Sequence, residues 1–199
     1  MTDTPAPRIV ILDRDGVINE DSDAYIKSVD EWHPVPGSID AIAKLSKAGY
    51  LIAVATNQSG LARGYFDEIT LANIHNLMNA TVEAAGGHID TLSYCPHGPD
   101  DNCSCRKPLT GLLDQIEDSL SVSVAGAWFV GDTQKDIDVA RAKSCKPVLV
   151  RSGKGLKTEA RLSEVDRASV PVFDDLAHAV DHILSHDAQP SLVEGLKQQ

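Results

Sequence analysis

The sequence predicts an α/β fold, in the form of a Rossmann-like, three-layer α/β/α domain with a mainly parallel sheet. Short, β-branched apolar runs alternate along the chain with segments whose apolar residues recur at helical spacing, and this alternation is the pattern of βαβ units. The length of 199 residues and the 42% content of hydrophobic residues suit one domain with a sizeable core. We therefore expect a single domain over residues 1–199.

Five apolar runs are predicted to be strands of this sheet. Continuous apolar runs, as opposed to alternating ones, are typical of strands that are covered on both faces. The strands are expected at residues 8–12, 50–55, 89–94, 127–130 and 147–150.

Five segments between and after these runs are predicted to be helices, at residues 38–48, 70–85, 110–120, 136–143 and 176–184. Either Asp67 or Thr70 is expected to cap the second helix. Residues 186–199 are expected to form a loose tail. The second helix carries an apolar stripe that we assign to the core: Leu71, Ile74, Leu77, Met78 and Val82.

The connections between these elements leave no room for a separate cap domain. Residues 13–36 are polar and rich in turn formers, which predicts a functional loop. We expect an open site, whose rim is formed by residues 20–36 and by the cysteine-rich loop that follows the third strand.

The charge and hydropathy of the chain exclude several classes of protein. Eighteen basic residues against 29 acidic ones give a net charge of −11, which in bulk repels nucleic acid and anionic membranes. No apolar run is long enough to span a bilayer, and no secretory signal is evident. We expect a cytoplasmic protein that binds neither nucleic acid nor membrane. It is expected to be a monomer, because no exposed apolar stripe is evident.

A cluster of cysteine and histidine follows the third predicted strand in the pattern Cys-x-His-x5-Cys-x-Cys. Cys95, His97, Cys103 and Cys105 supply three thiolates and one imidazole, a closed tetrahedral set for a structural Zn²⁺ ion. The loop is polar and has few apolar side chains to fold around, so we expect zinc to order it. Cys145 is separate and is assigned to the core.

Polar, reactive residues follow four of the predicted strands. These runs are 13–16 (DRDG), 56–60 (TNQSG), 106–108 (RKP) after the cysteines, and 131–136 (GDTQKD). In parallel α/β sheets, ligands bind beyond the carboxyl ends of the strands. We therefore expect the four runs to meet at one edge of the sheet.

The residue types in these runs point to phosphoryl transfer. Asp13 and Asp15 repel each other unless a cation lies near, and with Asp132 they offer the oxygen ligands that Mg²⁺ prefers. Lys107 and Arg106 add fixed positive charge suited to phosphate. One carboxylate can act as a nucleophile and another as a general acid and base.

The same four runs resemble the four motifs of the haloacid dehalogenase (HAD) superfamily, in that family's order. They read ILDRDGV, VATNQSG, the Lys of CRKP, and VGDTQKD. Together with the cysteine cluster they resemble, more narrowly, the D-glycero-D-manno-heptose-1,7-bisphosphate 7-phosphatases and the related histidinol-phosphate phosphatases.

The resemblance implies a role for each matching residue. Asp13 would be the nucleophile and a Mg²⁺ ligand, and Asp15 the general acid and base, with its backbone carbonyl on Mg²⁺. Thr56 would hold the phosphoryl group. Lys107 would neutralise Asp13 and the phosphoryl oxygens. Asp132 would be a further Mg²⁺ ligand.

The resemblance also implies the surroundings of this centre. Asp136 would lie in the outer shell of the Mg²⁺ site or brace its loop. The sugar phosphate would be contacted by Asp21, Tyr25, Asn57, Gln58, Ser59 and Arg106. Lys154 could contact the substrate phosphate, but ordinary solvated charge is the favoured interpretation. The histidines outside the cysteine cluster, His75 among them, are assigned to surface or satisfied positions. Arg14 receives no role.

The activity implied is Mg²⁺-dependent removal of the C7 phosphate of D-glycero-D-manno-heptose 1,7-bisphosphate through an aspartyl-phosphate, in nucleotide-activated heptose biosynthesis. Only five residues separate His97 from Cys103, a spacing similar to that of the histidinol-phosphate enzymes, so histidinol phosphate or another small phosphorylated metabolite is the alternative substrate. A phosphotransferase and a zinc-dependent docking module are the further alternatives. The docking module would not need the carboxylates and Lys107.

Overall fold

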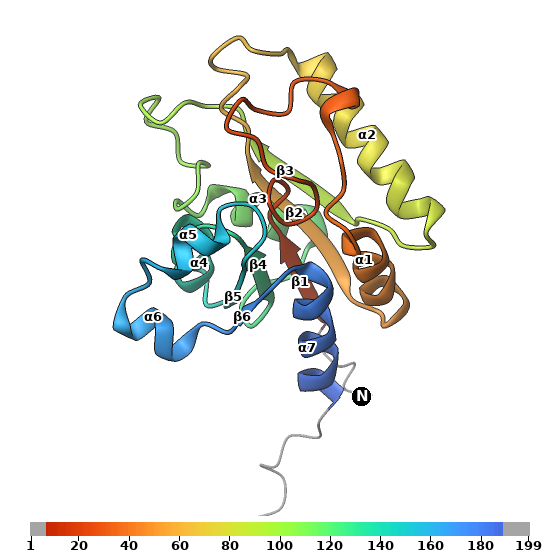
Figure 1. The fold of residues 1–199 in the computed structure, drawn as a ribbon, viewed down its shortest axis with the longest axis vertical. Helices are drawn as coiled ribbons and strands as arrows, with labels where there is room; N and C mark the ends of the chain where they lie inside the picture. The colour runs from red at the N-terminus through yellow and green to blue at the C-terminus, as the bar shows by residue number, and fades with distance from the viewer. Residues whose placement is uncertain (1–6, 189–199) are drawn as a thin grey trace, which may run out of the picture.

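Six parallel strands form the centre of the computed structural model, which describes residues 7–188 (Figure 1). They lie in the order β3-β2-β1-β4-β5-β6. The predicted Rossmann-like α/β fold is confirmed. The strands are β1 Ile9–Leu12, β2 Leu51–Asn57, β3 Thr91–Cys95, β4 Trp128–Gly131, β5 Lys146–Val150 and β6 Val172–Phe173.

The order of the strands reverses at β1. From this central strand the chain proceeds outward through β2 to β3, and then crosses to β4 on the other side of β1. Leu12, the last residue of β1, is paired with Val54 of β2 and with Val130 of β4. At such a switch point the loops that leave the two central strands diverge and open a crevice. The residues that follow β1 and β4 are thereby brought side by side.

Helices cover both faces of the sheet (Figure 1). Helices α1 Ser38–Lys47, α2 Glu68–Ala84 and α7 Leu176–Ala188 pack on the face that presents Val10 and Leu12. Helices α3 Gly111–Leu120 and α4 Gln134–Ala142 cover the opposite face, which presents Ile9 and Ile11. Neighbouring residues of a strand point to opposite faces, so the single apolar run of β1 contributes to both cores.

Three short elements are absent from the predicted set. They are helices α5 Gly155–Glu159 and α6 Glu164–Ser169 and strand β6, each too short to show a reliable period. Helix α7 continues to Ala188, four residues beyond its predicted end, so the expected tail is helical at its start. Residues 189–199 of that tail lie outside the described part of the chain.

Helix α2 corrects one part of the predicted core. Asp67 caps the helix by accepting a hydrogen bond from the Thr70 amide at 2.8 Å. Leu77 was expected in the core but is 37% exposed, whereas His75 is buried. The reason is the helical period. Residue 75 lies one turn after Leu71 and therefore on the buried face of α2, whereas residue 77 lies at the edge of that face.

The expectation of no separate cap domain is also confirmed for the described residues. The segment between β1 and α1 is a loop with one 3₁₀ turn, η1 Val29–Glu31, and a loop joins β2 to α2. Within residues 7–188 no helix is long and apolar enough to cross a membrane.

Candidate active site

The polar runs that follow the strands meet in one cavity of about 340 Å³. Of the residues predicted for the catalytic and sugar-binding site, all but Asp136 line it: Asp13, Asp15, Asp21, Tyr25, Thr56, Asn57, Gln58, Ser59, Arg106, Lys107 and Asp132. Asp136 does not line the cavity, but it forms an ion pair with Lys107, which does.

A buried ammonium lies at the centre of the site. Lys107 Nζ is 3.0 Å from Asp13 Oδ2 and 2.6 Å from Asp136 Oδ1, and the lysine side chain is 2% exposed. Burial by itself would lower the pKa of Lys107, but the two carboxylates raise it above its ordinary value. Lys107 is therefore a permanent cation beside the predicted nucleophile.

Asp136 braces this centre. Its Oδ2 accepts hydrogen bonds from the amide and the hydroxyl of Thr133, the residue that caps α4. Asp136 is 1% exposed. These contacts hold Asp136 against the start of α4 and leave its other oxygen for Lys107.

The backbone of Lys107 is clamped by Asn57 at the end of β2. Asn57 Oδ1 accepts from the Lys107 amide at 3.0 Å, and Asn57 Nδ2 donates to the Lys107 carbonyl at 3.2 Å. Asn57 was expected to contact the sugar. Asn57 lines the cavity, but both polar atoms of its side chain are hydrogen-bonded to the Lys107 backbone. These bonds hold the loop that carries Lys107 against the end of β2.

Asp13, Asp132 and Asp136 form a group of carboxylates that fits a divalent cation. One oxygen of each lies within 4.8 Å of the others. Burial and the neighbouring carboxylates raise the pKa of Asp13 to about 7, against the opposing effect of Lys107, and raise that of Asp132 to about 8. This negative charge exceeds what one lysine compensates, and oxygen ligands of this kind suit Mg²⁺. Asp13 and Asp132 line the cavity and can ligate it there, whereas Asp136 does not line the cavity and is engaged by Lys107 and Thr133.

The second carboxylate of the first motif is held differently. Asp15 accepts hydrogen bonds from Arg14, from Asn19 Nδ2 at 2.9 Å and from Gln58 Nε2 at 2.9 Å. Burial disfavours its ionised form, but the Arg14 charge and these donors lower the pKa of Asp15 below its ordinary value. Gln58, expected to contact the sugar, also donates to Thr56 Oγ1 at 2.8 Å and so acts within the site.

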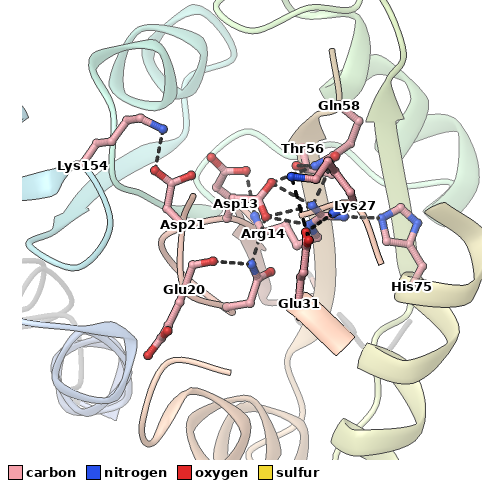
Figure 2. A network of polar contacts seen from close by, with 12 residues as sticks. Asp13, Arg14, Glu20, Asp21, Lys27, Glu31, Thr56, Gln58, His75 and Lys154 are labelled. Atoms are coloured by element: carbon pink, nitrogen blue, oxygen red, sulfur yellow. Dashed lines mark hydrogen bonds and ion pairs between the residues drawn. The ribbon is translucent and has the colours of Figure 1, made fainter. Parts of the chain in front are cut away.

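The rim of the cavity contains cations that the sequence reasoning did not assign. Lys154 Nζ is 2.5 Å from Asp21 Oδ2 (Figure 2), and the Lys154 amide donates to Asp132 Oδ2 at 2.7 Å. Lys135 and Lys154 both line the cavity, so solvated charge was an incomplete description of Lys154. Its position four residues after the fifth apolar run was an available signal, because β5 ends at the same edge as β4.

Tyr25 lies at the rim in an unusual backbone conformation. Its φ is 66°, a value that side chains other than glycine rarely adopt. Its ring packs on that of Tyr65 with centroids 5.0 Å apart. The loop after β1 and the loop before α2 are thereby joined beside the cavity.

The cysteine cluster is assembled as a metal site. One ligand atom from each of Cys95, His97, Cys103 and Cys105 lies within 4.8 Å of the others. The Cys95 sulfur is 3.7 Å from that of Cys103, 3.2 Å from that of Cys105 and 3.6 Å from His97 Nδ1. A tetrahedral Zn²⁺ ion with bonds of about 2.3 Å requires sulfurs separated by about 3.7 Å, so the donor set fits zinc. Cys145 is buried elsewhere, as expected.

The metal loop is tied to the cavity. Cys95 ends β3, Lys107 follows Cys105 by two residues, and Arg106 Nη1 donates to the carbonyl of His97 at 3.2 Å. Order imposed on the cluster therefore extends to both cations of the third motif.

The chain is similar to several known proteins. A family model for HAD-hydrolase-like proteins matches residues 104–179. D-glycero-beta-D-manno-heptose-1,7-bisphosphate 7-phosphatase of Pseudomonas aeruginosa is 52% identical over 176 residues, 88% of this chain and 97% of that protein. The enzyme of the same name from Bordetella bronchiseptica is 48% identical over 179 residues, 89% of this chain and 98% of that protein.

Solved structures agree with these relatives. The crystal structure of D,D-heptose 1,7-bisphosphate phosphatase from B. bronchiseptica, complexed with magnesium and phosphate, matches with a TM-score of 0.84 and 46% identity over 90% of this chain and 99% of that one. The enzyme of the same name from Burkholderia thailandensis matches with a TM-score of 0.69 and 37% identity over 89% of this chain and 99% of that one.

We predict that Gly16→Ala lowers the free energy of unfolding of the protein more than Gly126→Ala does. The two glycines have φ values of 82° and 80°, so both alanines incur the left-handed penalty of about 1–2 kcal/mol. A Cβ on Gly16 would also lie 2.2 Å from Asp132 Oδ2, whereas nothing lies within 4 Å at Gly126. Urea unfolding should show an additional loss of about 1–3 kcal/mol for Gly16→Ala. Equal losses would mean that Asp132 moves aside without cost.

We predict that the purified chain contains zinc in equimolar amount. Cys103→Ser should remove most of this zinc, because the closed set loses a thiolate ligand, and should lower the midpoint of thermal unfolding. Cys145→Ala is the matched control, since Cys145 lies outside the cluster and should leave the zinc content unchanged. Elemental analysis and thermal unfolding measure both effects. Full zinc retention in Cys103→Ser would contradict the assignment.

Proposed function

This chain belongs to the D-glycero-β-D-manno-heptose-1,7-bisphosphate 7-phosphatase family of HAD-like hydrolases, and we propose that it hydrolyses the C7 phosphate of this sugar bisphosphate. The products are heptose 1-phosphate and inorganic phosphate. The observation that carries the proposal is the Lys107 ammonium 3.0 Å from Asp13, on the floor of a cavity lined by further carboxylates and cations. The names of the relatives favour this substrate over histidinol phosphate.

Asp13 is the proposed nucleophile. One of its oxygens forms a bond to phosphorus while the bond from phosphorus to the C7 oxygen breaks, which gives an aspartyl-phosphate. Lys107 compensates negative charge on Asp13 and on the phosphoryl oxygens, and Thr56, which is 1% exposed, holds the phosphoryl group in place. Fixed positive charge in a buried site stabilises a charged transition state strongly, because it needs no reorganisation during the reaction.

Asp13, Asp132 and the backbone carbonyl of Asp15 are the proposed ligands of Mg²⁺, with Asp136 outside the direct ligand set. When bound, Mg²⁺ supplies charge neutralisation at the phosphoryl oxygens. This assignment is supported by the excess of buried carboxylate described above and by the magnesium in the B. bronchiseptica structure.

Asp15 is the proposed general acid and base. It gives a proton to the departing sugar oxygen, and in the second half of the reaction it takes one from the water that attacks the aspartyl-phosphate. A bound phosphoryl dianion brings negative charge toward Asp15 and favours its protonated form. Without substrate the pKa of Asp15 is low, which favours the ionised carboxylate that acts as the base.

The remaining contacts to the sugar phosphate are proposed to come from the rim. Arg106, Lys135 and Lys154 supply the cations that a second phosphate requires, against a chain with a net charge of −11. Tyr25, Asp21 and Ser59 line the same opening. With no inserted lid, the exposed end of the substrate is held mainly by this charged rim.

We further propose that the protein works as a monomer in the cytoplasm. The large apolar side chains exposed in the described residues are spread over several elements, for example Val29 on η1, Ile69 on α2 and Val165 on α6. The four cysteines are free thiols, which is typical of a reducing compartment such as the cytoplasm.

The proposal is tested by phosphate release from heptose 1,7-bisphosphate and from histidinol phosphate at equal concentrations, with Mg²⁺ present or chelated. We expect phosphate to appear in step with loss of the bisphosphate, with a kcat/KM at least about tenfold higher than for histidinol phosphate. Activity should disappear with the chelator and return with Mg²⁺. Substrate loss without free phosphate would indicate transfer to another acceptor, and preference for histidinol phosphate would overturn the substrate assignment.

We predict that Asp13→Asn abolishes turnover while the fold is kept. The amide is a poor nucleophile, so kcat should fall by at least about a thousandfold. The thermal unfolding midpoint should not fall, because one of several crowded carboxylates has been removed. Asp40→Asn, an exposed carboxylate on α1, is the control and should keep full activity. Retained turnover in Asp13→Asn would overturn the assignment of Asp13 as the nucleophile.

A further inference from the structure

Arg14 is a buried guanidinium to which the proposed reaction assigns no role. It lies between the nucleophile and the general acid and base in sequence, and is 1% exposed. Its Nη2 donates to both oxygens of Asp15, at 2.8 and 3.0 Å, and its Nε donates to Oδ1 at 3.1 Å. Burying a guanidinium is costly unless it is paired with good geometry. This fork-shaped pairing on a catalytic carboxylate therefore calls for an explanation.

His75 of α2 holds Arg14 from behind. Arg14 Nη1 is 3.2 Å from His75 Nε2 (Figure 2). His75 is itself buried, and its ring packs on Tyr94 with centroids 5.8 Å apart. Burial and the Arg14 charge lower the pKa of His75 to about 4, so at neutral pH the ring is neutral and Nε2 accepts the hydrogen bond.

Two amides complete the arrangement. Gln58 Oε1 accepts from Arg14 Nη2 at 3.2 Å, while Gln58 Nε2 donates to Asp15 Oδ2. Asn19 Nδ2 donates to Asp15 Oδ1. Both oxygens of Asp15 are therefore held by donors from two loops, and Arg14 is anchored in turn to a helix.

We propose that Arg14, anchored by His75, is a positioning residue that fixes the Asp15 carboxyl in the orientation required for proton transfer. This inference rests on the proposed phosphatase reaction. In the first step the proton leaves Asp15 for the departing oxygen as that oxygen breaks from phosphorus and Asp13 bonds to phosphorus. In the second step water oxygen bonds to phosphorus, its proton passes to Asp15, and the bond between phosphorus and Asp13 breaks.

A comparison of leaving groups separates positioning of Asp15 from a general structural role. A sugar alkoxide needs a proton as it departs, whereas p-nitrophenyl phosphate releases a stabilised phenolate that does not. The kcat/KM of each substrate covers only the steps up to departure of the leaving group. A defect confined to Asp15 therefore lowers kcat/KM for the alkyl ester and spares that for the aryl ester.

Arg14→Lys keeps the charge but loses the fork. We expect its kcat/KM to fall by about 10- to 100-fold with the heptose bisphosphate, within the range of general acid catalysis, and by less than about threefold with p-nitrophenyl phosphate. Its kcat for the aryl ester should still fall, because hydrolysis of the aspartyl-phosphate uses Asp15 as the base. A purely structural role would lower the kcat/KM values of both substrates alike.

His75 supplies a second, milder set of variants. His75→Leu removes the acceptor behind Arg14 and should reproduce the same pattern to a smaller extent. His75→Gln should keep the wild-type ratio of the two kcat/KM values, because a glutamine oxygen can occupy the place of Nε2 and accept the hydrogen bond from Arg14. Ser38→Ala is the control, since it removes a different buried hydrogen bond, from Ser38 Oγ to the Ile18 carbonyl at 2.6 Å, and should change stability but not the ratio.

Two results would overturn the inference: equal losses of kcat/KM on both substrates in Arg14→Lys and His75→Leu, or no change of kcat/KM on either substrate in these variants. Failure of the proposed function is distinguishable, because there the wild-type chain would not release phosphate from the heptose bisphosphate. The comparison is then made with whichever alkyl phosphate the wild-type chain hydrolyses.

Discussion

The site depends on one electrostatic constraint, the burial of several carboxylates around a single ammonium. Lys107 lies between Asp13 and Asp136, within hydrogen-bonding distance of both. A buried pair of this kind is costly to desolvate, and it persists only when its geometry is held and its remaining polar atoms are satisfied. Asn57 clamps the lysine backbone and Thr133 satisfies Asp136. The residual negative charge is what makes the site a receptor for a divalent cation and then for a phosphoryl group.

The sheet holds the carboxylates of this arrangement in place, and the metal cluster holds the lysine. The switch point beside β1 brings the loops that carry Asp13 and Asp132 together, and the parallel strands hold them rigidly. Lys107 instead comes from a polar loop with little apolar material to bury. The cluster of thiols and imidazole replaces the missing core there, and the bond from Arg106 to the His97 carbonyl connects it to the cavity. A metal ion bound by this cluster would support a site that it does not touch.

The two carboxylates of the first motif are treated in opposite ways. Asp13 faces other carboxylates and one lysine, which leaves it dependent on a cation, whereas Asp15 is surrounded by Arg14, Asn19 and Gln58. Environments that differ in this manner allow two identical side chains to serve as nucleophile and as acid and base. The positive rim then supplies local attraction for an anionic substrate, despite the acidic surface of the chain as a whole.

Much of this could be predicted from the sequence alone, because it depends on local order along the chain. Apolar runs alternating with helical periods identify a parallel α/β sheet, and polar runs directly after the strands identify its active edge. The spacing of Cys95, His97, Cys103 and Cys105 identifies a metal site. The short elements α5, α6 and β6 were not predicted, because a segment of two to six residues shows no measurable hydrophobic period.

The tertiary structure decided which polar groups face one another. Arg14, His75 and Gln58 come from a loop, a helix and a strand end that are far apart in the chain, so no local pattern could reveal that they converge on Asp15. The same holds for the amide of Asn57, which clamps Lys107, and for Lys154, whose neighbour is Asp21. Sequence order determines which residue types arrive at the edge of the sheet. Their hydrogen-bond partners depend on distances between loops, and only the folded chain sets these distances.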